Sequence, residues 1–380
     1  MPVWNRLKLK ALKLEILQLE TWQRHGLKVL MLGLVCASVL GWSAPAQALP
    51  PGNAITDSQA LLRYALPIDN PDVRRLQFSL EDITAQLRAN RRWGAVVGDV
   101  KQAYRVLTDR QDKILASVSD DKKPQAEVLI EKLKSGVEAL QVSAEAKDKE
   151  QTRSLRADLL SLVSDLEALM VQKFPYEVPE EYSNLPQLKG RATVAAKTSQ
   201  GDLTIVLDGF SAPVTAGNFV DLVKRGFYDG LQFTRAEDSY VLQIGDPPGP
   251  EVGFIDPATQ KYRAVPLEIL VKGDNAPLYG ITLEDAGRYL DQPVLPFSSF
   301  GALAMARPGD DPNGGSSQFF FFLFEPELTP AGLNLLDGRY AIFGFVTSGR
   351  EVLEKLKAGD TIESMKVIDG LENLVEPKAA

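Results

Sequence analysis

The side chains best suited to chemistry lie in the second half of this 380-residue sequence. Arg235 follows a Phe-Thr pair, Gln243 comes shortly after it, and Gln318 directly precedes four consecutive phenylalanines. An arginine keeps its charge at physiological pH and presents a rigid fork of N–H donors, so it can act on a bound group without giving up a proton. Taken alone, however, Arg235 is better explained by a surface ion pair with Glu237 or Asp238.

Residue types that perform covalent or metal chemistry are nearly absent. The chain has one histidine and one cysteine, His25 and Cys36, and both lie in the first 48 residues. Removal of that segment would leave no disulfide, no thiolate nucleophile, no Cys/His zinc site and no imidazole base. We therefore expect no metal and no cofactor, and we expect arginine, carboxylates, hydroxyls and pocket shape to carry any chemistry.

The first 48 residues have the pattern of an export signal. Arg24 and Lys28 form a basic flank, residues 27–42 are almost entirely apolar, and Ala-Gln-Ala at 46–48 supplies the small residues that signal peptidase requires. Cleavage would leave Leu49 as the first mature residue. The alternative is an uncleaved membrane anchor, but this apolar run is shorter than the roughly 20 residues that span a bilayer. We expect cleavage and export.

The charge balance limits the possible partners. The whole chain carries 42 basic and 50 acidic residues, for a net charge of −8, and removal of the first 48 residues leaves 36 basic and 48 acidic residues, or −12. A negative surface argues against nucleic acid as the main partner and against adsorption to an anionic membrane. The remaining 332 residues exceed what one hydrophobic core usually organises, so we expect two domains.

Residues 57–174 have the periodicity of a helical bundle. Apolar residues recur at three- and four-residue steps, which predicts four main antiparallel helices and a short leading helix near residues 57–64. Asn70-Pro71 predicts one helix start, with an N-cap before a proline at the first helical position, and Asp120-Asp121 predicts another. The inward positions contain no histidine, so they indicate core packing and not a cofactor site. The first and last stripes are Val73, Leu76, Leu80, Ile83 and Leu87, and Leu155, Leu159, Leu162, Leu166 and Leu169.

Residues 175–190 predict a connection between domains, because Pro175, Pro179, Pro186 and Gly190, together with several polar residues, stop helix formation. The pattern then changes to short β-type runs at 193–197 and 203–207, separated by Ser-Gln-Gly-Asp. The second domain therefore opens with a hairpin, and a helix is expected at 215–225.

The second domain carries a series of motifs in a fixed order. The first are Ala-Pro-Val-Thr-Ala-Gly-Asn-Phe at 212–219, Gly-Phe-Tyr-Asp-Gly at 226–230 and Phe-Thr-Arg at 233–235, followed by Gln243 and Gly245-Asp246. Gly-Ala-Leu-Ala-Met-Ala at 301–306, Ser-Gln-Phe-Phe at 317–320 and Leu-Asp-Gly-Arg-Tyr-Ala-Ile-Phe-Gly at 336–344 complete the series. Together these motifs resemble the cyclophilin family over nearly all of the chain beyond Gly190.

The resemblance implies a multidomain protein, with an N-terminal all-α helical bundle followed by a C-terminal cyclophilin-like domain. The family fold is a closed antiparallel β-barrel of eight strands with two helices. The expected organisation is a signal peptide at 1–48, the helical bundle at 49–174, a linker at 175–190 and the cyclophilin-like domain at 191–380.

A narrower resemblance points to the multidomain cyclophilins of the thylakoid lumen and their cyanobacterial relatives. It rests on the leader, the helical domain, the segment Pro-Leu-Glu-Ile-Leu-Val-Lys-Gly-Asp at 266–274, and an unusually long spacing of 54 residues between Asp246 and Gly301. Plant members are linked to photosystem II assembly and maintenance, and their helical domain is likened to small extrinsic subunits of that complex. The resemblance implies a thylakoid-lumen or periplasmic location and proline-containing client proteins, among them photosystem II subunits. The charge balance predicts no nucleic-acid partner, and cleavage of the leader predicts no stable membrane insertion. The short proline-containing linker suggests a contact between the bundle and the cyclophilin domain.

The activity of the family, peptidylprolyl cis-trans isomerisation, needs neither a nucleophile nor a titrating base. Rotation about an X-Pro bond has a barrier of about 18–20 kcal/mol because it breaks amide resonance. A pocket for the proline ring and a donor that weakens C–N conjugation are sufficient. By resemblance, Arg235 is the catalytic arginine that donates toward the prolyl nitrogen. The positions matching the family's substrate-binding residues are Tyr240, Gln243, Ala306, Arg307, Gln318, Phe320, Leu336 and Tyr340.

Within this set, Tyr240, Phe320 and Leu336 match positions that line the proline pocket, and Gln243 and Gln318 match positions that hold the peptide backbone. Phe320 has an alternative explanation, because a strand with phenylalanine on both faces can simply be core. Its place two residues after Gln318 favours the pocket.

Several family positions are altered. Thr234 and Tyr340 replace histidines, Tyr240 replaces a phenylalanine, Leu335 replaces a tryptophan, and Arg307 stands where an asparagine is usual. These changes predict an altered rate and substrate range, and the missing tryptophan predicts weak cyclosporin binding. Three hypotheses stay open: an isomerase, a chaperone-like assembly factor that holds protein loops in the same groove with little turnover, and a bundle that regulates access to the groove.

Overall fold

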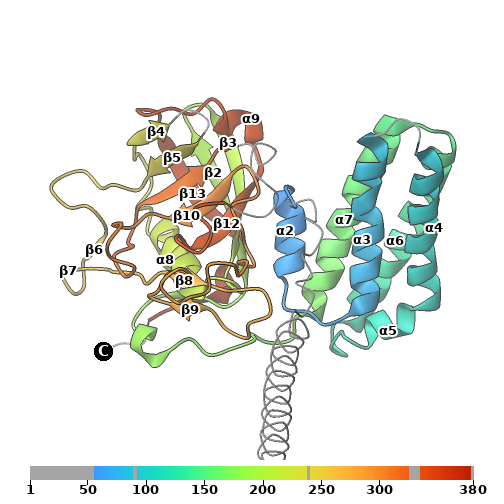
Figure 1. Ribbon diagram of the computed structural model, residues 1–380, viewed down its shortest axis with the longest axis horizontal. Coiled ribbons are helices and arrows are strands. Elements are labelled where there is room, and N and C mark those ends of the chain that lie inside the picture. The colour runs from blue at the N-terminus through green and yellow to red at the C-terminus, as the bar shows by residue number, and fades with distance from the viewer. Residues whose placement is uncertain (1–54, 89–91, 238–239, 325–333, 378–380) are drawn as a thin grey trace, which may run out of the picture. The chain divides into compact units, whose positions relative to one another are not determined.

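The computed structural model describes residues 55–88, 92–237, 240–324 and 334–377 (Figure 1). The expected signal peptide, residues 1–48, lies outside these ranges. Within them, no helix combines the length and the apolar character that a bilayer crossing requires.

The helical region has four long helices around an apolar core. They are α3 (Pro71–Arg88), α4 (Trp93–Asp109), α6 (Lys123–Glu145) and α7 (Lys149–Met170), and the short α5 (Gln111–Leu115) lies between α4 and α6 in the chain. Helices α3 and α6 each pack against both α4 and α7. This is the bundle that the apolar stripes predict.

The first predicted N-cap is confirmed, whereas at the second start a helix does follow Asp120-Asp121 but neither aspartate caps it. Asn70 Oδ1 accepts a hydrogen bond from the Val73 amide at 2.9 Å, and Pro71 is the first residue of α3. Helix α6 instead begins at Lys123, and its cap residue makes no side-chain cap bond. Asp120 is used differently, since its carboxylate accepts from Lys123 Nζ at 2.6 Å.

The predicted apolar stripe matches the buried face of α3 better than that of α7. All five residues of the α3 stripe are buried. On α7, Leu159 and Leu166 are buried, but Leu155, Leu162 and Leu169 are only partly buried. Helix α7 packs against both α3 and α6, so its buried sector is rotated and also includes Leu160, Val163 and Met170.

The second region is built on one antiparallel sheet of eight strands (Figure 1). The strand order is β13-β2-β3-β12-β10-β11-β5-β4. The strands are β2 (Arg191–Thr198), β3 (Gly201–Asp208), β4 (Arg235–Glu237), β5 (Val241–Ile244), β10 (Ala302–Met305), β11 (Phe319–Phe322), β12 (Ile342–Ser348) and β13 (Ile362–Asp369). The predicted opening hairpin is β2 and β3, and the predicted helix is α8 (Pro213–Lys224), followed near the C-terminus by α9 (Arg350–Leu353).

The closed barrel expected for this region is not confirmed. The sheet curls, but its edge strands β4 and β13 do not form a continuous ladder in the described residues. The edges meet at one end, where an isolated bridge pairs Gln232 with Thr361. Backbone hydrogen bonds of 2.7–2.9 Å join residues 230–233 to residues 359–362 there, among them one from the Phe233 amide to Asp360 O at 2.9 Å. These contacts come from the residues just before β4, whereas the three residues of β4 itself pair only with β5 among the described residues.

Alternation along β11 divides the apolar side chains of the sheet into two clusters. Phe319 and Phe321 face the inner cluster, where they lie with Phe219 of α8. Phe320 and Phe322 face the outer cluster. Besides these two, the outer cluster contains Val241, Leu295, Phe297, Ala302, Ala304, Ile342 and Phe345 of the β region, together with Leu61, Leu62 and Ala65 of helix α2 (Ser58–Ala65).

The long spacing before Gly301 contains two small hairpins. Strands β6 (Ile255–Asp256) and β7 (Lys261–Tyr262) form the first, and β8 (Glu268–Ile269) and β9 (Leu278–Tyr279) form the second. The buried Glu268 carboxylate accepts the amides of Val214 and Thr215 at the start of α8. Burial raises the pKa of Glu268 to about 7. The second hairpin therefore fixes the first turn of α8.

Candidate active site

The strand register places three predicted site residues in a row. Arg235 on β4 lies opposite Gln243 on β5, and Gln243 lies opposite Phe320 on β11. Directly opposite residues of antiparallel strands point to the same face, with Cβ atoms about 4.5–5.5 Å apart. Residues from three separate sequence motifs therefore share one surface.

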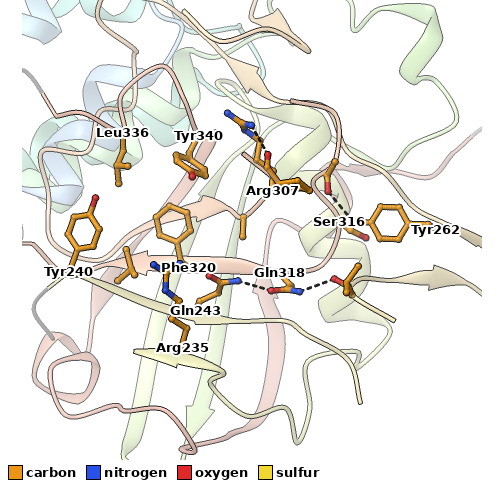
Figure 2. Close-up of a pocket in the computed structure, with 15 residues that line it drawn as sticks. Arg235, Tyr240, Gln243, Tyr262, Arg307, Ser316, Gln318, Phe320, Leu336 and Tyr340 are labelled. Carbon is orange, nitrogen blue, oxygen red and sulfur yellow. Dashed lines mark hydrogen bonds between the residues drawn. The ribbon is translucent and has the colours of Figure 1, made fainter. Parts of the chain in front are cut away.

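This surface is the floor of a pocket of about 510 Å³ (Figure 2). The structure brings together all nine predicted site residues around it: Arg235, Tyr240, Gln243, Ala306, Arg307, Gln318, Phe320, Leu336 and Tyr340. Six further residues that were not predicted from the sequence also line the pocket: Val241, Val252, Tyr262, Pro308, Gly314 and Ser316.

One part of the pocket is apolar and aromatic. The Phe320 and Tyr340 rings meet edge to face with centroids 5.4 Å apart, and Leu336 and Tyr240 also line this part. The Arg307 guanidinium lies 5.3 Å from the centre of the Tyr340 ring and donates from Nη2 to Arg339 O at 2.8 Å. Such a surface can receive a small apolar ring such as that of proline.

Phe320 is both a core residue and a residue of the pocket. Only 6 % of its surface is exposed and it belongs to the outer cluster, so it is a core residue. It also lines the pocket. A ring held by the core on one side and open to a ligand on the other is a rigid binding surface, because closely packed side chains have little freedom to move.

The polar part of the pocket is a chain of side-chain hydrogen bonds. Gln243 Nε2 donates to Gln318 Oε1 at 2.7 Å, and Gln318 Nε2 donates to Asp246 Oδ1 at 3.0 Å (Figure 2). Gln318 Nε2 also donates to the carbonyl of Val252 at 2.8 Å. The two amides are thereby oriented beside the aromatic surface, where they can bind the backbone of an extended peptide.

Arg235 lies at the exposed edge of the pocket. Its side chain is 56 % exposed, and its Nε donates to Glu237 Oε1 at 2.9 Å. The simpler explanation of Arg235, an ion pair with Glu237, is therefore realised alongside its place in the pocket. Asp238, the other partner considered, lies outside the described residues.

Two of the missed residues come from the segment between Asp246 and Gly301. Tyr262 Oη donates to Gly314 O at 3.0 Å, and burial raises the pKa of this phenol. Val252 is held through its carbonyl by Gln318. The unusual length of the segment was the only sequence signal that it contributes to the site, because neither residue belongs to a recognised motif.

The described residues contain no group of three or more histidine, cysteine, aspartate or glutamate side chains placed to hold a metal ion. The pocket offers a guanidinium, two amides and aromatic rings instead.

An antiparallel sheet that carries an arginine, two glutamines and an aromatic pocket on its outer face, with a helix against its inner face, defines a cyclophilin. Residues 193–372 match the family model of cyclophilin type peptidyl-prolyl cis-trans isomerases. Residues 57–171 match a second model, described as peptidyl-prolyl cis-trans isomerase CYP38-like, PsbQ-like domain. The chain belongs to the cyclophilin-type peptidyl-prolyl cis-trans isomerases with a CYP38-like, PsbQ-like helical domain.

Relatives match along most of the chain. A protein of Synechocystis sp. described as a thylakoid lumen peptidyl-prolyl cis-trans isomerase is 58 % identical over 364 residues, which cover 93 % of this chain and 96 % of that protein. The chloroplastic CYP38 of Arabidopsis thaliana is 46 % identical, covering 92 % of this chain and 86 % of that protein. A solved structure of a Cryptosporidium parvum cyclophilin, determined with the dipeptide Ala-Pro, covers 47 % of this chain and 99 % of its own, with 25 % identity and a TM-score of 0.35.

Proposed function

We propose that this isomerase acts on X-Pro bonds of exported or lumenal proteins through Arg235, and that it serves the assembly or maintenance of photosystem II. The main support for the catalytic role is the alignment of Arg235, Gln243 and Phe320 across three neighbouring strands. It supplies a donor, a backbone anchor and a ring surface within one peptide-sized pocket.

In this mechanism the proline ring lies on Phe320, between Leu336, Tyr240 and Tyr340. Gln243 and Gln318 hold the flanking peptide backbone, so that the X-Pro bond is fixed on both sides. Arg235 donates a hydrogen bond to the prolyl nitrogen as it becomes pyramidal, which stabilises the twisted amide relative to the planar one. No proton is transferred, and no group has to titrate.

The catalytic proposal is tested by following cis-to-trans conversion of an X-Pro peptide by the purified chain and by its Arg235→Ala variant. Removal of one donor aimed at the transition state costs on the order of 100-fold in rate. Arg225→Ala is a matched control, because Arg225 is also a partly exposed arginine in an ion pair, with Asp221, and it does not line the pocket. Equal activity of the Arg235 variant and the parent would refute the role given to this side chain.

A second candidate function is a binding module that holds exposed loops in the same groove with little turnover. The observation that favours it is the ion pair of Arg235 with Glu237, because the donor needed for catalysis is already engaged. The two functions can be distinguished by expressing the parent or the Arg235→Ala variant in a strain that lacks this gene. Full rescue by Arg235→Ala would favour binding alone, and rescue by the parent only would favour catalysis.

The link to photosystem II is supported by the PsbQ-like description of the helical family model and by the thylakoid lumen description of the Synechocystis relative. Photosystem II accumulation in the deletion strain, with and without the parent gene, tests it directly. The proposed cleavage after Ala48 is tested by sequencing the N-terminus of the protein isolated from the lumen or periplasm. An N-terminus that still begins at Met1 would contradict the proposed cleavage.

A further inference from the structure

Helix α2 (blue in Figure 1) precedes the bundle in sequence, but its apolar side chains pack with the sheet. Leu61, Leu62 and Ala65 are between 4 % and 7 % exposed and belong to the outer cluster. The helix begins at an N-cap, Asp57, whose carboxylate accepts the amides of Gln59 and Ala60. The stretch around Leu61 therefore folds as a defined helix and buries its apolar face against strands more than 130 residues away in the chain.

Hydrogen bonds tie the same stretch to the β region. Ser298 Oγ donates to Ile55 O at 2.7 Å, and Ser58 Oγ donates to Val346 O at 3.3 Å. A guanidinium N–H of Arg191 on β2 donates to Leu62 O. The link of α2 to the bundle is different in kind, because the described contacts there are polar: Arg63 pairs with Glu81 at 3.0 Å, and Arg74 Nη2 donates to Leu66 O at 2.9 Å.

The outer cluster that α2 joins extends to the pocket through Phe297. The Phe297 ring stacks on the pocket residue Phe320 with centroids 6.1 Å apart and planes at 4°. The Phe297 amide donates to Asp337 Oδ1 at 2.7 Å, and Asp337 directly follows the pocket residue Leu336. Phe297 thus contacts Phe320 and the turn that presents Leu336, while its neighbour Ser298 is bound to Ile55.

We propose that α2 is a positioning element of the proline pocket, which holds Phe297 and, through it, Phe320 and Leu336. The functional unit of the isomerase then begins at about residue 55 and not at the start of the second domain. The physical reason is close packing: when a buried leucine is removed, the cavity that remains is only partly filled, so the neighbouring side chains move or lose their fixed positions. Residues that contact no substrate thereby set the shape of the pocket.

The test uses the full chain with Leu61→Ala and Leu62→Ala combined. The matched control combines Leu133→Ala and Leu140→Ala, two fully buried leucines of α6 in the bundle core. Affinity for an X-Pro peptide and the rate of exchange are measured together by NMR. Because loss of a preformed binding surface weakens ground state and transition state alike, we expect KM to rise about 10-fold in the α2 variant with little change in kcat. The control should leave KM unchanged although it removes the same number of atoms.

Two further variants keep the proposal falsifiable. Leu61→Met with Leu62→Met conserves side-chain volume and should restore the parent KM. If the double alanine variant does not fold, Ser298→Ala removes only the hydrogen bond to Ile55 and should raise KM about twofold to threefold while the chain remains folded. The proposal is overturned if a folded α2 variant binds the peptide like the parent, or if the bundle-core control weakens binding equally. Peptide affinity and turnover are measured separately. If the parent binds the peptide but does not isomerise it, the proposed catalysis is refuted. The affinities of the α2 variants then still test the role of α2.

Discussion

Arg235 and Glu237 form an ion pair at the edge of the proline pocket, with Arg235 Nε donating to Glu237 Oε1 at 2.9 Å. Both side chains are about half exposed, at 56 % and 45 %. A substrate that recruits this guanidinium therefore competes with a carboxylate two residues away. This competition, like the replaced pocket residues, predicts a change in activity.

Replacement of Glu237 by glutamine should raise kcat/KM by up to about 5-fold, because an exposed ion pair is worth at most about 1 kcal/mol and this energy would no longer oppose substrate binding. The free energy of unfolding should change by less than about 1 kcal/mol for the same reason. Peptide turnover and urea unfolding check the two expectations. A fall in kcat/KM would mean that Glu237 orients Arg235 for catalysis.

Comparison of Phe320→Ala with Phe321→Ala should distinguish the effect of losing a peptide-binding surface from the effect of losing core packing. Both rings are buried on β11, but Phe320 faces the pocket and Phe321 faces the inner cluster. Each substitution should lower the free energy of unfolding by roughly 3–5 kcal/mol. Only Phe320→Ala should also raise KM for an X-Pro peptide, measured well below the unfolding temperature of both variants. An equal rise in KM for Phe321→Ala would show that the pocket responds to core packing in general.

Gly245→Ala should damage the amide chain of the pocket. Gly245 has φ +104°, and a Cβ there would collide with the carbonyl oxygen of Ser317, the residue before Gln318. Gly249 is a matched control, because it has a similar φ of +118° but nothing within 4 Å of an added Cβ. Strain at positive φ costs about 1–3 kcal/mol in either variant. Gly245→Ala should lose more stability than Gly249→Ala and should also raise KM, and similar effects on KM would contradict the link to Gln318.

Glu167 should make stability depend on pH. Its side chain is fully buried, Oε1 accepts from Arg74 at 3.1 Å, and Oε2 has no hydrogen-bond partner among the described residues. Burial raises its pKa from 4.5 to about 7, despite the opposing charge of Arg74. Between these two pH values the folded chain binds more protons than the unfolded chain, so the free energy of unfolding falls as pH rises from about 4.5 to 7.

Glu167→Gln should remove this part of the pH dependence. The full effect of one such group is roughly 3 kcal/mol, present below pH 4.5 and lost above pH 7. Denaturant unfolding of parent and variant at several pH values between 4.5 and 8 measures the difference. Glu127→Gln, on an exposed part of α6, controls for the loss of a carboxylate. Parallel pH profiles for the parent and Glu167→Gln would contradict the assignment.

Nine residues of the pocket could be predicted from the sequence, because the ordered motifs around them resemble those of the cyclophilin family and these positions match its site residues. The Phe-Thr-Arg run identified Arg235, and the Ser-Gln-Phe-Phe run identified Gln318 and Phe320. All nine predicted side chains line one pocket. The bundle helices could also be predicted, because an amphipathic stripe such as that of α3 has to be buried against neighbouring elements.

Features that depend on distant partners escaped prediction. The buried sector of α7 is rotated away from its predicted stripe, because two neighbouring helices and not the periodicity alone define it. Val252 and Tyr262 entered the pocket without any motif. The expected continuous closure of the sheet was not seen, because the backbone contacts between its two edges are confined to residues 230–233 and 359–362.

The sequence by itself determined the two kinds of structure, the order of the motifs and the chemical types available to the site, because these follow from local periodicity and from which side chains are present. The tertiary structure decided which residues meet. Strand register set Arg235 beside Gln243 and Gln243 beside Phe320. Long-range packing placed Leu61 and Leu62 of α2 in the cluster behind the pocket. The hydrophobic effect is not directional, so an eight-residue amphipathic helix such as α2 does not show in its own sequence which surface it will cover.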